Sequence, residues 1–196
     1  MSATAVPAPA TVEDLYGVPD NVKAELVDGE LHYMSPTGFW PGRASGRIYR
    51  SLTEYEESVG GGFALPDNVG FVVNLLRRRS FSPDAAFFTG QPSGMRYLQG
   101  APAFAAEVRS LGDYDEAANR DIVAKRRDYF AAGTLVVWDV DLLAGEVRKF
   151  TAEGGAEAPA AVFRRGDVAD AEPAVPGWRL PTDELLPPAA PESEGA

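Results

Sequence analysis

Two short runs of alternating apolar and polar residues near the N-terminus predict a β-hairpin. The runs cover residues 24–27 and 30–34, and Asp28-Gly29 stands between them. A type I′ turn needs a positive φ at both central residues, and Asp followed by Gly accepts this conformation readily. We therefore expect two antiparallel strands joined by a tight turn.

Helical patterns stand on either side of this hairpin. Before it, Thr11 followed by acidic residues is typical of a helix N-cap, and Gly17 keeps that helix short. After it, apolar residues recur at helical spacing from about residue 41 to 58, and the glycines at 60–62 end the run. A short helix, a hairpin and a long helix are thus expected in the first third of the chain.

The rest of the chain consists of apolar runs and one further helical stretch. These runs predict strands at residues 62–65, 69–75, 81–88, 104–108, 134–141, 146–150 and 161–165, and a helix at 116–132 that ends at Gly133. Residues 166–186 contain scattered prolines and are expected to be irregular.

The helix at 116–132 connects two strands that are apolar enough to lie in the centre of a sheet. Together with the strands at 103–109 and 135–140 it predicts a βαβ unit, whose strands pair in parallel with a right-handed crossover. The remaining strands are expected to pair antiparallel, so the sheet should be mixed. The predicted fold class is α/β, a mixed β-sheet flanked by helices with an N-terminal β-hairpin.

Length, charge and composition limit what this fold can be. The 196 residues fit one domain at about 11–186, with a disordered lead at 1–10 and a disordered tail at 187–196. The net charge of −11 repels nucleic acid at long range, so a polyanion site would need a local basic patch. The absence of Cys excludes disulfides, thiolate zinc sites and cysteine nucleophiles.

No targeting or membrane segment is predicted. The opening residues MSATAVPAPA lack a basic region and contain proline where a signal peptide is apolar. No apolar stretch reaches the roughly 18 to 20 residues of a transmembrane helix. We expect a soluble, cytoplasmic protein that does not bind membranes.

A pair of acids inside apolar strands is the strongest chemical signal. Asp84 lies in the run 81–88 and Glu107 in the run 104–108, and a buried carboxylate is costly unless it is paired or holds a metal. If the two strands are neighbours, the carboxylates converge and favour a cation between them. Mg²⁺ or Mn²⁺ suits two carboxylates plus waters, and Lys125 on the following helix would orient the water or stabilise developing charge.

A purely structural interpretation of the same acids is also open. Asp84 follows Pro83, and Pro-Asp pairs are common in turns. Glu107 can pair with Arg109, which lies on the same strand face, or with an arginine of the helix. Asp139, at the end of a buried strand, fits either a cleft or a turn.

Several segments of the chain resemble a known family. PDAAF, AAEVRS, DIVAKRRDYFAAG and VVWDVD follow one another in this order, and AELVDGELHYMSP precedes them. They are similar to the motifs of the bacterial Uma-type endonucleases, formerly a domain of unknown function, in the restriction-endonuclease-like PD-(D/E)XK superfamily. The resemblance covers about residues 11–150. It implies a small mixed sheet flanked by helices and Mg²⁺-dependent hydrolysis of DNA phosphodiester bonds.

The resemblance also implies roles for individual residues. The PD of the family pattern falls on Pro83-Asp84 and the next acid on Glu107, which would be the metal ligands. The family lysine falls on Lys125, and the acid of the hairpin falls on Glu25, as an additional metal ligand or water-orienting group. Superfamily members that cut both strands often dimerise, so a homodimer is expected.

Two departures from the family pattern leave the activity of the site open. The family carries a His early in the first long helix, where this chain has PGRASGR, and the only His of the chain, His32, falls in the hairpin. Arg109 stands where the superfamily has its standard Lys. It either substitutes for that Lys, without being able to act as a base, or neutralises Glu107 and abolishes metal binding.

Further arginines have more than one interpretation. Helix phasing places Arg126 near the middle of the apolar stripe and Lys125 at its edge, so Arg126, like Arg109, is a candidate to support the metal ligands. Two further groups of arginines have two open interpretations: they contact phosphates, or they form a solvated surface. These residues are Arg43, Arg47, Arg50, Arg77, Arg78 and Arg79.

Three functions are compatible with these observations. The first is a metal-dependent endonuclease acting on DNA through Asp84 and Glu107, with Lys125 and Glu25 beside them. The second is a catalytically inactive binding or assembly module of the nuclease fold, which Arg109, the missing helix His and the net charge of −11 favour. The third is hydrolysis or phosphotransfer on small nucleotides, which an acidic surface hinders less.

Overall fold

The computed structural model describes residues 8–19 and 21–188. Its helices are α1 (Val12–Tyr16), α2 (Phe39–Val59), α3 (Glu116–Ala132) and the short 3-10 helix η1 (Thr182–Glu184). Its strands are β1 (Lys23–Val27), β2 (Glu30–Met34), β3 (Phe63–Leu65), β4 (Phe71–Val72), β5 (Ser80–Phe81), β6 (Ala85–Phe88), β7 (Leu98–Gln99), β8 (Phe104–Val108), β9 (Val136–Asp141), β10 (Glu146–Thr151), β11 (Ala161–Arg164), β12 (Val168–Asp170) and β13 (Arg179–Pro181).

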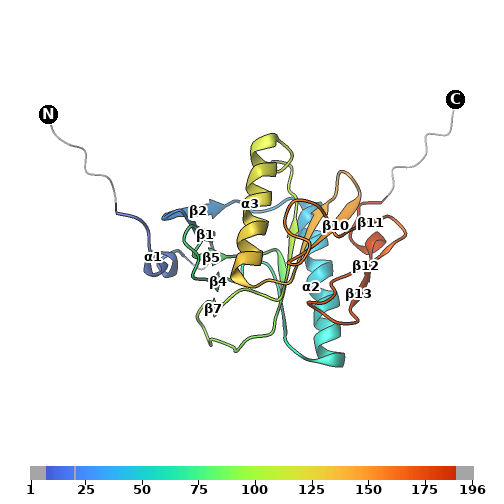
Figure 1. Ribbon diagram of the computed structural model, residues 1–196, viewed down its shortest axis with the longest axis horizontal. Coiled ribbons are helices and arrows are strands. Elements are labelled where there is room, and N and C mark those ends of the chain that lie inside the picture. Colours follow the sequence, from blue (N-terminus) through green and yellow to red (C-terminus); the bar gives the residue numbers. More distant parts are fainter. Residues whose placement is uncertain (1–7, 20, 189–196) are drawn as a thin grey trace.

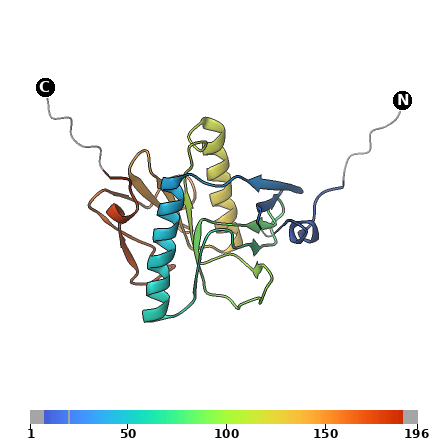
Figure 2. The same cartoon turned by 180° about the vertical axis from the view of Figure 1, so that it is seen from behind.

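A mixed sheet of six strands forms the centre of the molecule. Its strand order is β11-β10-β9-β8-β6-β3, in which β8 and β9 are parallel and the other neighbours are antiparallel. Helix α3 lies on one face of this sheet and α2 on the other, as the two opposite views show (Figure 1, Figure 2). The parallel pairing of β8 and β9, with α3 between them in the chain, confirms the predicted βαβ unit.

Alternate residues of the central strands face the two helices, because successive side chains of a strand point to opposite faces. The core on the α2 side includes Ile48, Leu52, Phe104, Trp138 and Val140. The core on the α3 side includes Phe81, Ala86, Ala105, Tyr129 and Val137. Glu107 and Asp139 stand two residues after Ala105 and Val137, so they belong to the α3 side of the sheet.

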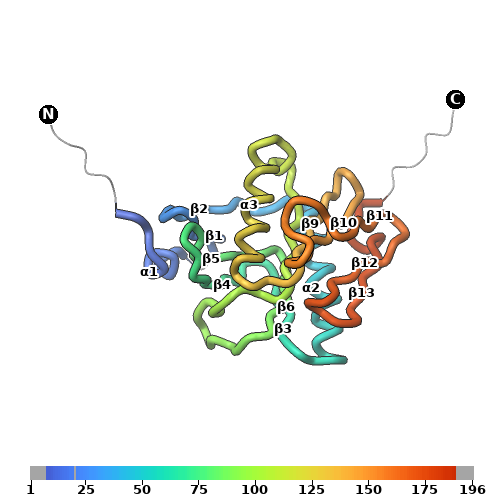
Figure 3. Tube along the Cα trace, viewed as in Figure 1, coloured from blue at the N-terminus to red at the C-terminus, as the bar shows by residue number. Residues whose placement is uncertain are grey.

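Smaller β units flank the central sheet. The hairpin β1–β2 and the three-stranded sheet β5-β4-β7 lie with α1 on one side of the molecule, and the hairpin β12–β13 lies on the other (Figure 1). The tube in Figure 3 follows the chain from α1 through the centre to β13. The backbone N–H of Arg79 donates to the Leu26 carbonyl (2.9 Å) and so joins the first hairpin to the three-stranded sheet.

The first hairpin and the helix caps agree with the predictions. Strands β1 and β2 pair around Asp28-Gly29, and both turn residues have a positive φ, 51° and 76°. Thr11 caps α1 in a capping box with Asp14, and Gly133 ends α3 in the left-handed conformation.

The single strand predicted over residues 81–88 is wrong, because two strands in different sheets replace it. Strand β5 pairs with β4 in the small sheet, whereas β6 pairs with β8 in the central sheet. Pro83 lies between them and has no N–H to donate to a ladder, so the chain changes sheets at this point. The strand predicted over 69–75 is likewise shortened to β4.

The irregular structure predicted for residues 166–186 is also wrong. This region contains β12, β13 and η1, and its Trp178 and Leu180 belong to the core on the α2 side. Both strands are 3 residues long, which is too short for an alternating pattern to be recognised in the sequence.

Two further predictions concern disorder at the ends of the chain and the absence of a membrane-spanning helix. The disorder expected for 1–10 and 187–196 falls largely on residues 1–7 and 189–196, which lie outside the described residues. Ala10, which is described, donates its backbone N–H to the Gly29 carbonyl (2.7 Å). Within the described ranges, no helix carries an apolar stretch long enough to cross a membrane.

Candidate active site

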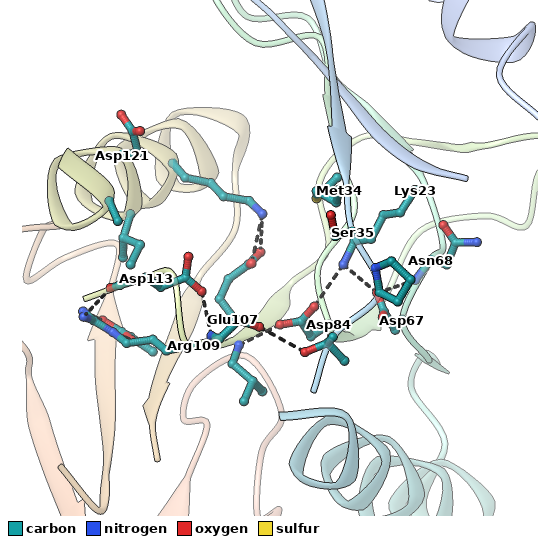
Figure 4. A pocket seen from close by; sticks show the side chains of 18 of the residues that line it. Lys23, Met34, Ser35, Asp67, Asn68, Asp84, Glu107, Arg109, Asp113 and Asp121 are labelled. Atoms are coloured by element: carbon teal, nitrogen blue, oxygen red, sulfur yellow. Dashed lines mark hydrogen bonds and ion pairs between the residues drawn. The ribbon is translucent and has the colours of Figure 1, made fainter. Parts of the chain in front are cut away.

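A cleft of about 630 Å³ opens where the hairpin β1–β2 faces the ends of β6 and β8 and one side of α3. Lys23 comes from the hairpin, Asp84 from the residue just before β6, Glu107 from β8 and Lys125 from α3, and all four line the cleft. Figure 4 shows Asp84 between Glu107 on one side and Lys23 with Asp67 on the other. Asp84, Glu107 and Lys125, which the sequence singled out, are therefore together.

The register of β6 and β8 makes Asp84 and Glu107 neighbours. Ala85 pairs with Ala106, so the residue before Ala85 stands opposite the residue after Ala106. The Asp84 N–H donates to the Ala106 carbonyl (3.1 Å), and the Val108 N–H donates to the side-chain Oδ2 of Asp84 (2.7 Å), so Asp84 is bonded to the residues on either side of Glu107. The condition for the two carboxylates to converge, that their strands are neighbours, is met by β6 and β8.

Glu107 accepts hydrogen bonds from two successive turns of α3. Lys125 Nζ donates to Oε2 (2.9 Å), and Tyr129 Oη donates to Oε1 (2.6 Å). The four-residue spacing brings both donors to one helix face, and the fully buried Tyr129 ring stacks on Phe81 with centroids 4.0 Å apart. Burial and two nearby carboxylates raise the pKa of Glu107 above that of an ordinary Glu, although Lys125 opposes this shift.

Lys23 is a cleft residue that the sequence reasoning missed. Its Nζ donates to Asp84 Oδ1 (2.9 Å) and to Asp67 Oδ1 (2.6 Å). Strand alternation places Lys23 on the same face of β1 as Glu25, which is a weak signal, and no pattern connects Asp67 with the hairpin. Burial lowers the pKa of Lys23, but the charges of Asp84, Glu107 and Asp67 outweigh burial and raise the pKa above its ordinary value.

Glu25 lies beneath the cleft and is not one of its lining residues. Its carboxylate, 5% exposed, accepts hydrogen bonds from Arg78 and from the Ser82 N–H (2.9 Å) and pairs with Lys125 (2.9 Å). Burial alone would raise the pKa of Glu25, but Lys125 and Arg78 outweigh it and hold the pKa below that of an ordinary Glu. Lys125 therefore bridges Glu25 and Glu107, and Glu25 is connected to the cleft through Lys125 and Arg78, which both line it.

The Arg109 side chain is bonded to Asp139 and not to Glu107. Its Nε and Nη2 donate to the two oxygens of Asp139 (2.7 and 2.8 Å), and its Nη1 donates to Asn119 Oδ1 (2.8 Å). Asp139 stands next to Glu107 in the register of β8 and β9, and the buried Arg126 reaches it as well (3.4 Å). Arg109 is thus neutralised by Asp139 and forms no ion pair with Glu107.

Most of the arginines considered for phosphate contact are paired with acids of the chain. The pairs are Arg47 and Arg50 with Glu184, Arg77 with Asp28, and Arg78 with Glu25 and Asp128. In the part of the chain that the structure describes, Arg43 and Arg79 have no ion pair. His32 is an exposed residue of β2, in the predicted hairpin.

The donor set of the cleft fits a hard divalent cation that keeps much of its water shell. Across residues 8–19 and 21–188, no group of three or more His, Cys, Asp or Glu side chains is arranged to hold a metal ion. Asp84 and Glu107 nevertheless present carboxylate oxygens to one cleft, and Mg²⁺ commonly takes one or two carboxylates and several waters. Each carboxylate also accepts a hydrogen bond from a lysine ammonium that balances its charge: Asp84 from Lys23 and Glu107 from Lys125.

Comparisons with known proteins agree with this fold. A family model described as "Uma2: Putative restriction endonuclease" matches residues 9–183. A crystal structure from Anabaena variabilis ATCC 29413, described as "a putative nuclease belonging to DUF820", is similar with a TM-score of 0.69 and 13% identity, over 91% of this chain and 98% of that chain. No curated protein matches the chain.

At this low identity the solved structure shows the fold alone, and it confirms the predicted mixed α/β architecture of the nuclease fold. The family model covers most of the chain, including the hairpin, the PD segment, β8 and α3, whose motifs carried the resemblance. The chain belongs to the Uma2 family, whose members are restriction-endonuclease-like proteins.

Proposed function

We propose that the protein is an endonuclease that hydrolyses DNA phosphodiester bonds in the cleft with a divalent cation, Mg²⁺ or Mn²⁺. The observation that carries this proposal is the cross-strand apposition of Asp84 and Glu107, with Lys125 bonded to Glu107. Membership of the Uma2 family supports a nuclease function, and the cleft supports its location on the molecule.

Asp84 and Glu107 would hold the cation through their carboxylate oxygens. When bound, such an ion lowers the pKa of a coordinated water and stabilises negative charge on a phosphoryl oxygen. Lys125 contacts both oxygens of Glu107 and Tyr129 donates to one of them, which keeps the carboxylate in one orientation. Lys125 also brings positive charge to the place where charge develops on the phosphate.

We assign supporting roles to the remaining predicted residues. Glu25 positions Lys125 from beneath the cleft, because Glu25 contacts that lysine and does not line the cleft. Arg109 and Arg126 hold Asp139, so that this buried acid does not add a negative charge beside Glu107.

Asp84→Asn tests the proposal. The amide keeps an acceptor for the Val108 N–H but removes the charge that attracts a cation, so activity should fall by about 100-fold or more. Activity is measured as nicking of supercoiled plasmid and cleavage of single-stranded DNA with Mg²⁺, Mn²⁺ or EDTA. Asp84→Asn protein as active as the parent would contradict the assignment.

Asp170→Asn is the matched control for this experiment. Asp170 accepts from Lys149 Nζ (2.6 Å) and from the Glu172 N–H (2.9 Å), and its side chain, like that of Asp84, is 22% exposed. It does not line the cleft, so this variant should cleave DNA as the parent does. Loss of activity in both variants would indicate a general effect of removing a partly buried carboxylate.

A catalytically inactive binding or assembly module is the alternative function. The net charge of −11 favours it, because an acidic molecule repels DNA at long range. This alternative predicts no specific binding of Mg²⁺ or Mn²⁺ in calorimetry and no cleavage with any metal. We also infer a cytoplasmic homodimer from the sequence and the family resemblance, and light scattering of the purified protein tests its oligomeric state.

A further inference from the structure

Lysine is scarce in this chain, and most of it lies at the cleft. Lysine occurs only at positions 23, 125 and 149, while all the other strongly basic side chains are arginines. Lys23 and Lys125 line the cleft, one bonded to Asp84 and the other to Glu107. An ammonium is a compact charge with rotatable donors, whereas a guanidinium is a rigid planar fork. The cleft therefore holds the type of cation that exchanges partners most easily.

Lys23 shares its ammonium between two carboxylates. It donates to Asp84 Oδ1 (2.9 Å) and to Asp67 Oδ1 (2.6 Å), and the side chains of Lys23 and Asp67 are 16% and 42% exposed. Asp67 lies in the segment between β3 and β4, on the side of Asp84 away from Glu107 (Figure 4). If the bond to Asp84 were lost, the bond to Asp67 would still hold Lys23 at the cleft.

The other cations that line the cleft are more firmly engaged. Lys125 lies between Glu25 and Glu107, both of which bond to it. Arg78 is 7% exposed and pairs with Glu25 and Asp128. The Arg109 fork is occupied by its bidentate contact with Asp139. Lys23 is thus the lining cation that can most readily release one partner and accept another.

We propose that Lys23 has two binding states. While no divalent cation is bound, its ammonium is bonded to Asp84. When a cation binds Asp84, Lys23 keeps its bond to Asp67 and binds a phosphate oxygen of the nucleic-acid backbone. This inference rests on the proposed function, because it assigns a ligand in the same cleft. Lys23 and the divalent cation compete for Asp84 Oδ1, since two positive charges at one oxygen repel each other. An ammonium donor released in this way is a common ligand of phosphate.

Lys23→Met tests both parts of the inference. Calorimetry with Mn²⁺ in the absence of DNA should show about tenfold tighter binding than in the parent, because the competing ammonium is gone. With saturating Mn²⁺, the KM for DNA cleavage should rise about tenfold, because a phosphate contact is lost. If Lys23 only supported the structure, its removal would loosen the site and weaken Mn²⁺ binding.

Two further variants serve as controls. Lys149→Met removes the same charge from the pair of Lys149 with Asp170, outside the cleft, and should leave Mn²⁺ affinity and KM as in the parent. Lys23→Arg keeps a positive charge at the site, and its Mn²⁺ affinity should stay within about twofold of the parent.

The outcomes separate this inference from the proposed function. If the parent binds Mn²⁺ and cleaves DNA but Lys23→Met binds Mn²⁺ no more tightly, the competition is disproved and the nuclease function stands. An unchanged KM in Lys23→Met overturns the phosphate contact. If neither the parent nor Lys23→Met binds Mn²⁺, the inference and the proposed function are both overturned.

Discussion

Asp84, Glu107 and Asp139, three acids that line the cleft, accept hydrogen bonds from different side chains. Asp84 accepts from Lys23 and a backbone N–H, Glu107 accepts from Lys125 and Tyr129, and Asp139 accepts from arginines. Buried or half-buried carboxylates need such partners, because an unpaired charge in a low-dielectric environment is strongly destabilising. The division of donors keeps arginine away from the two proposed metal ligands and leaves them with lysines.

Tyr129→Phe is expected to weaken the site without disturbing the core. The ring keeps its stack on Phe81, but Glu107 Oε1 loses the hydroxyl donor at 2.6 Å and keeps only Lys125, so the orientation of the carboxylate is less well defined. We expect Mn²⁺ affinity to fall several-fold and the free energy of unfolding to fall by about 1 to 2 kcal/mol. Calorimetry and urea unfolding measure these quantities.

Tyr55→Phe is the control for this prediction. Tyr55 Oη donates to the Pro176 carbonyl (2.9 Å), and neither residue lines the cleft, so removal of this hydroxyl should leave Mn²⁺ affinity unchanged. Equal Mn²⁺ affinity in Tyr129→Phe and the parent would show that this hydroxyl does not position Glu107.

At the level of elements, charged side chains attach the first hairpin to the rest of the molecule. Glu25 on β1 bonds to Arg78, which comes just before β5 and also pairs with Asp128 of α3. Lys125 adds a second link between β1 and α3 through the same glutamate. The hairpin forms one wall of the cleft, so this network determines where Lys23 stands relative to Asp84.

Glu25→Gln should destabilise the fold, because it leaves Arg78 and Lys125 each with one carboxylate fewer. Loss of one partner from a buried pair costs about 3 kcal/mol or more at pH 7. The folded-state pKa of Glu25 is lowered, so its contribution is fully present above the ordinary carboxyl pKa and is lost as the pH falls through the lowered folded value.

The difference in stability between the parent and Glu25→Gln should therefore shrink as the pH is lowered below about 4. Urea unfolding at several pH values measures this difference. Glu30→Gln, on the exposed strand of the same hairpin, should change stability by less than about 0.5 kcal/mol. A Glu25 effect that stayed constant down to acid pH would mean that its charge does not stabilise the hairpin.

Over the whole molecule, most positively charged side chains are paired with acidic side chains of the same chain. Nearly all described arginines form ion pairs with acids of the chain, and those without one in the described residues are Arg43, Arg79 and Arg96. With a net charge of −11, the surface offers few phosphate contacts. Any nuclease activity would then depend on the local charges of the cleft more than on long-range attraction.

Binding of duplex DNA should accordingly be weak and only moderately sensitive to salt. About three phosphate contacts give a slope of about −3 in a plot of log K against log salt concentration. Fluorescence anisotropy of a labelled duplex in EDTA, between low and physiological salt, measures this slope without cleavage. A slope of about −6 or steeper would contradict this prediction, because it would require a basic surface whose side chains are free to contact phosphates.

The sequence by itself determined several turns and helix ends and singled out two acids of the candidate site. The Asp28-Gly29 turn, the cap at Thr11 and the end of α3 at Gly133 depend on short-range backbone preferences, which the chain carries in neighbouring residues. Asp84 and Glu107 stood out because acids are unusual in apolar strands. Family motifs in the right order supplied the fold, which the comparisons confirm.

Only the tertiary structure decided which charges meet. Lys23 and Asp67 come together with Asp84 from different elements, and Arg109 pairs with Asp139 because β9 lies beside β8. The break at Pro83, where the chain passes from one sheet to another, depends on strand partners far away in the sequence. Local patterns report the propensities of adjacent residues, whereas the pairing of charges is set by long-range strand order and register, which no short segment encodes.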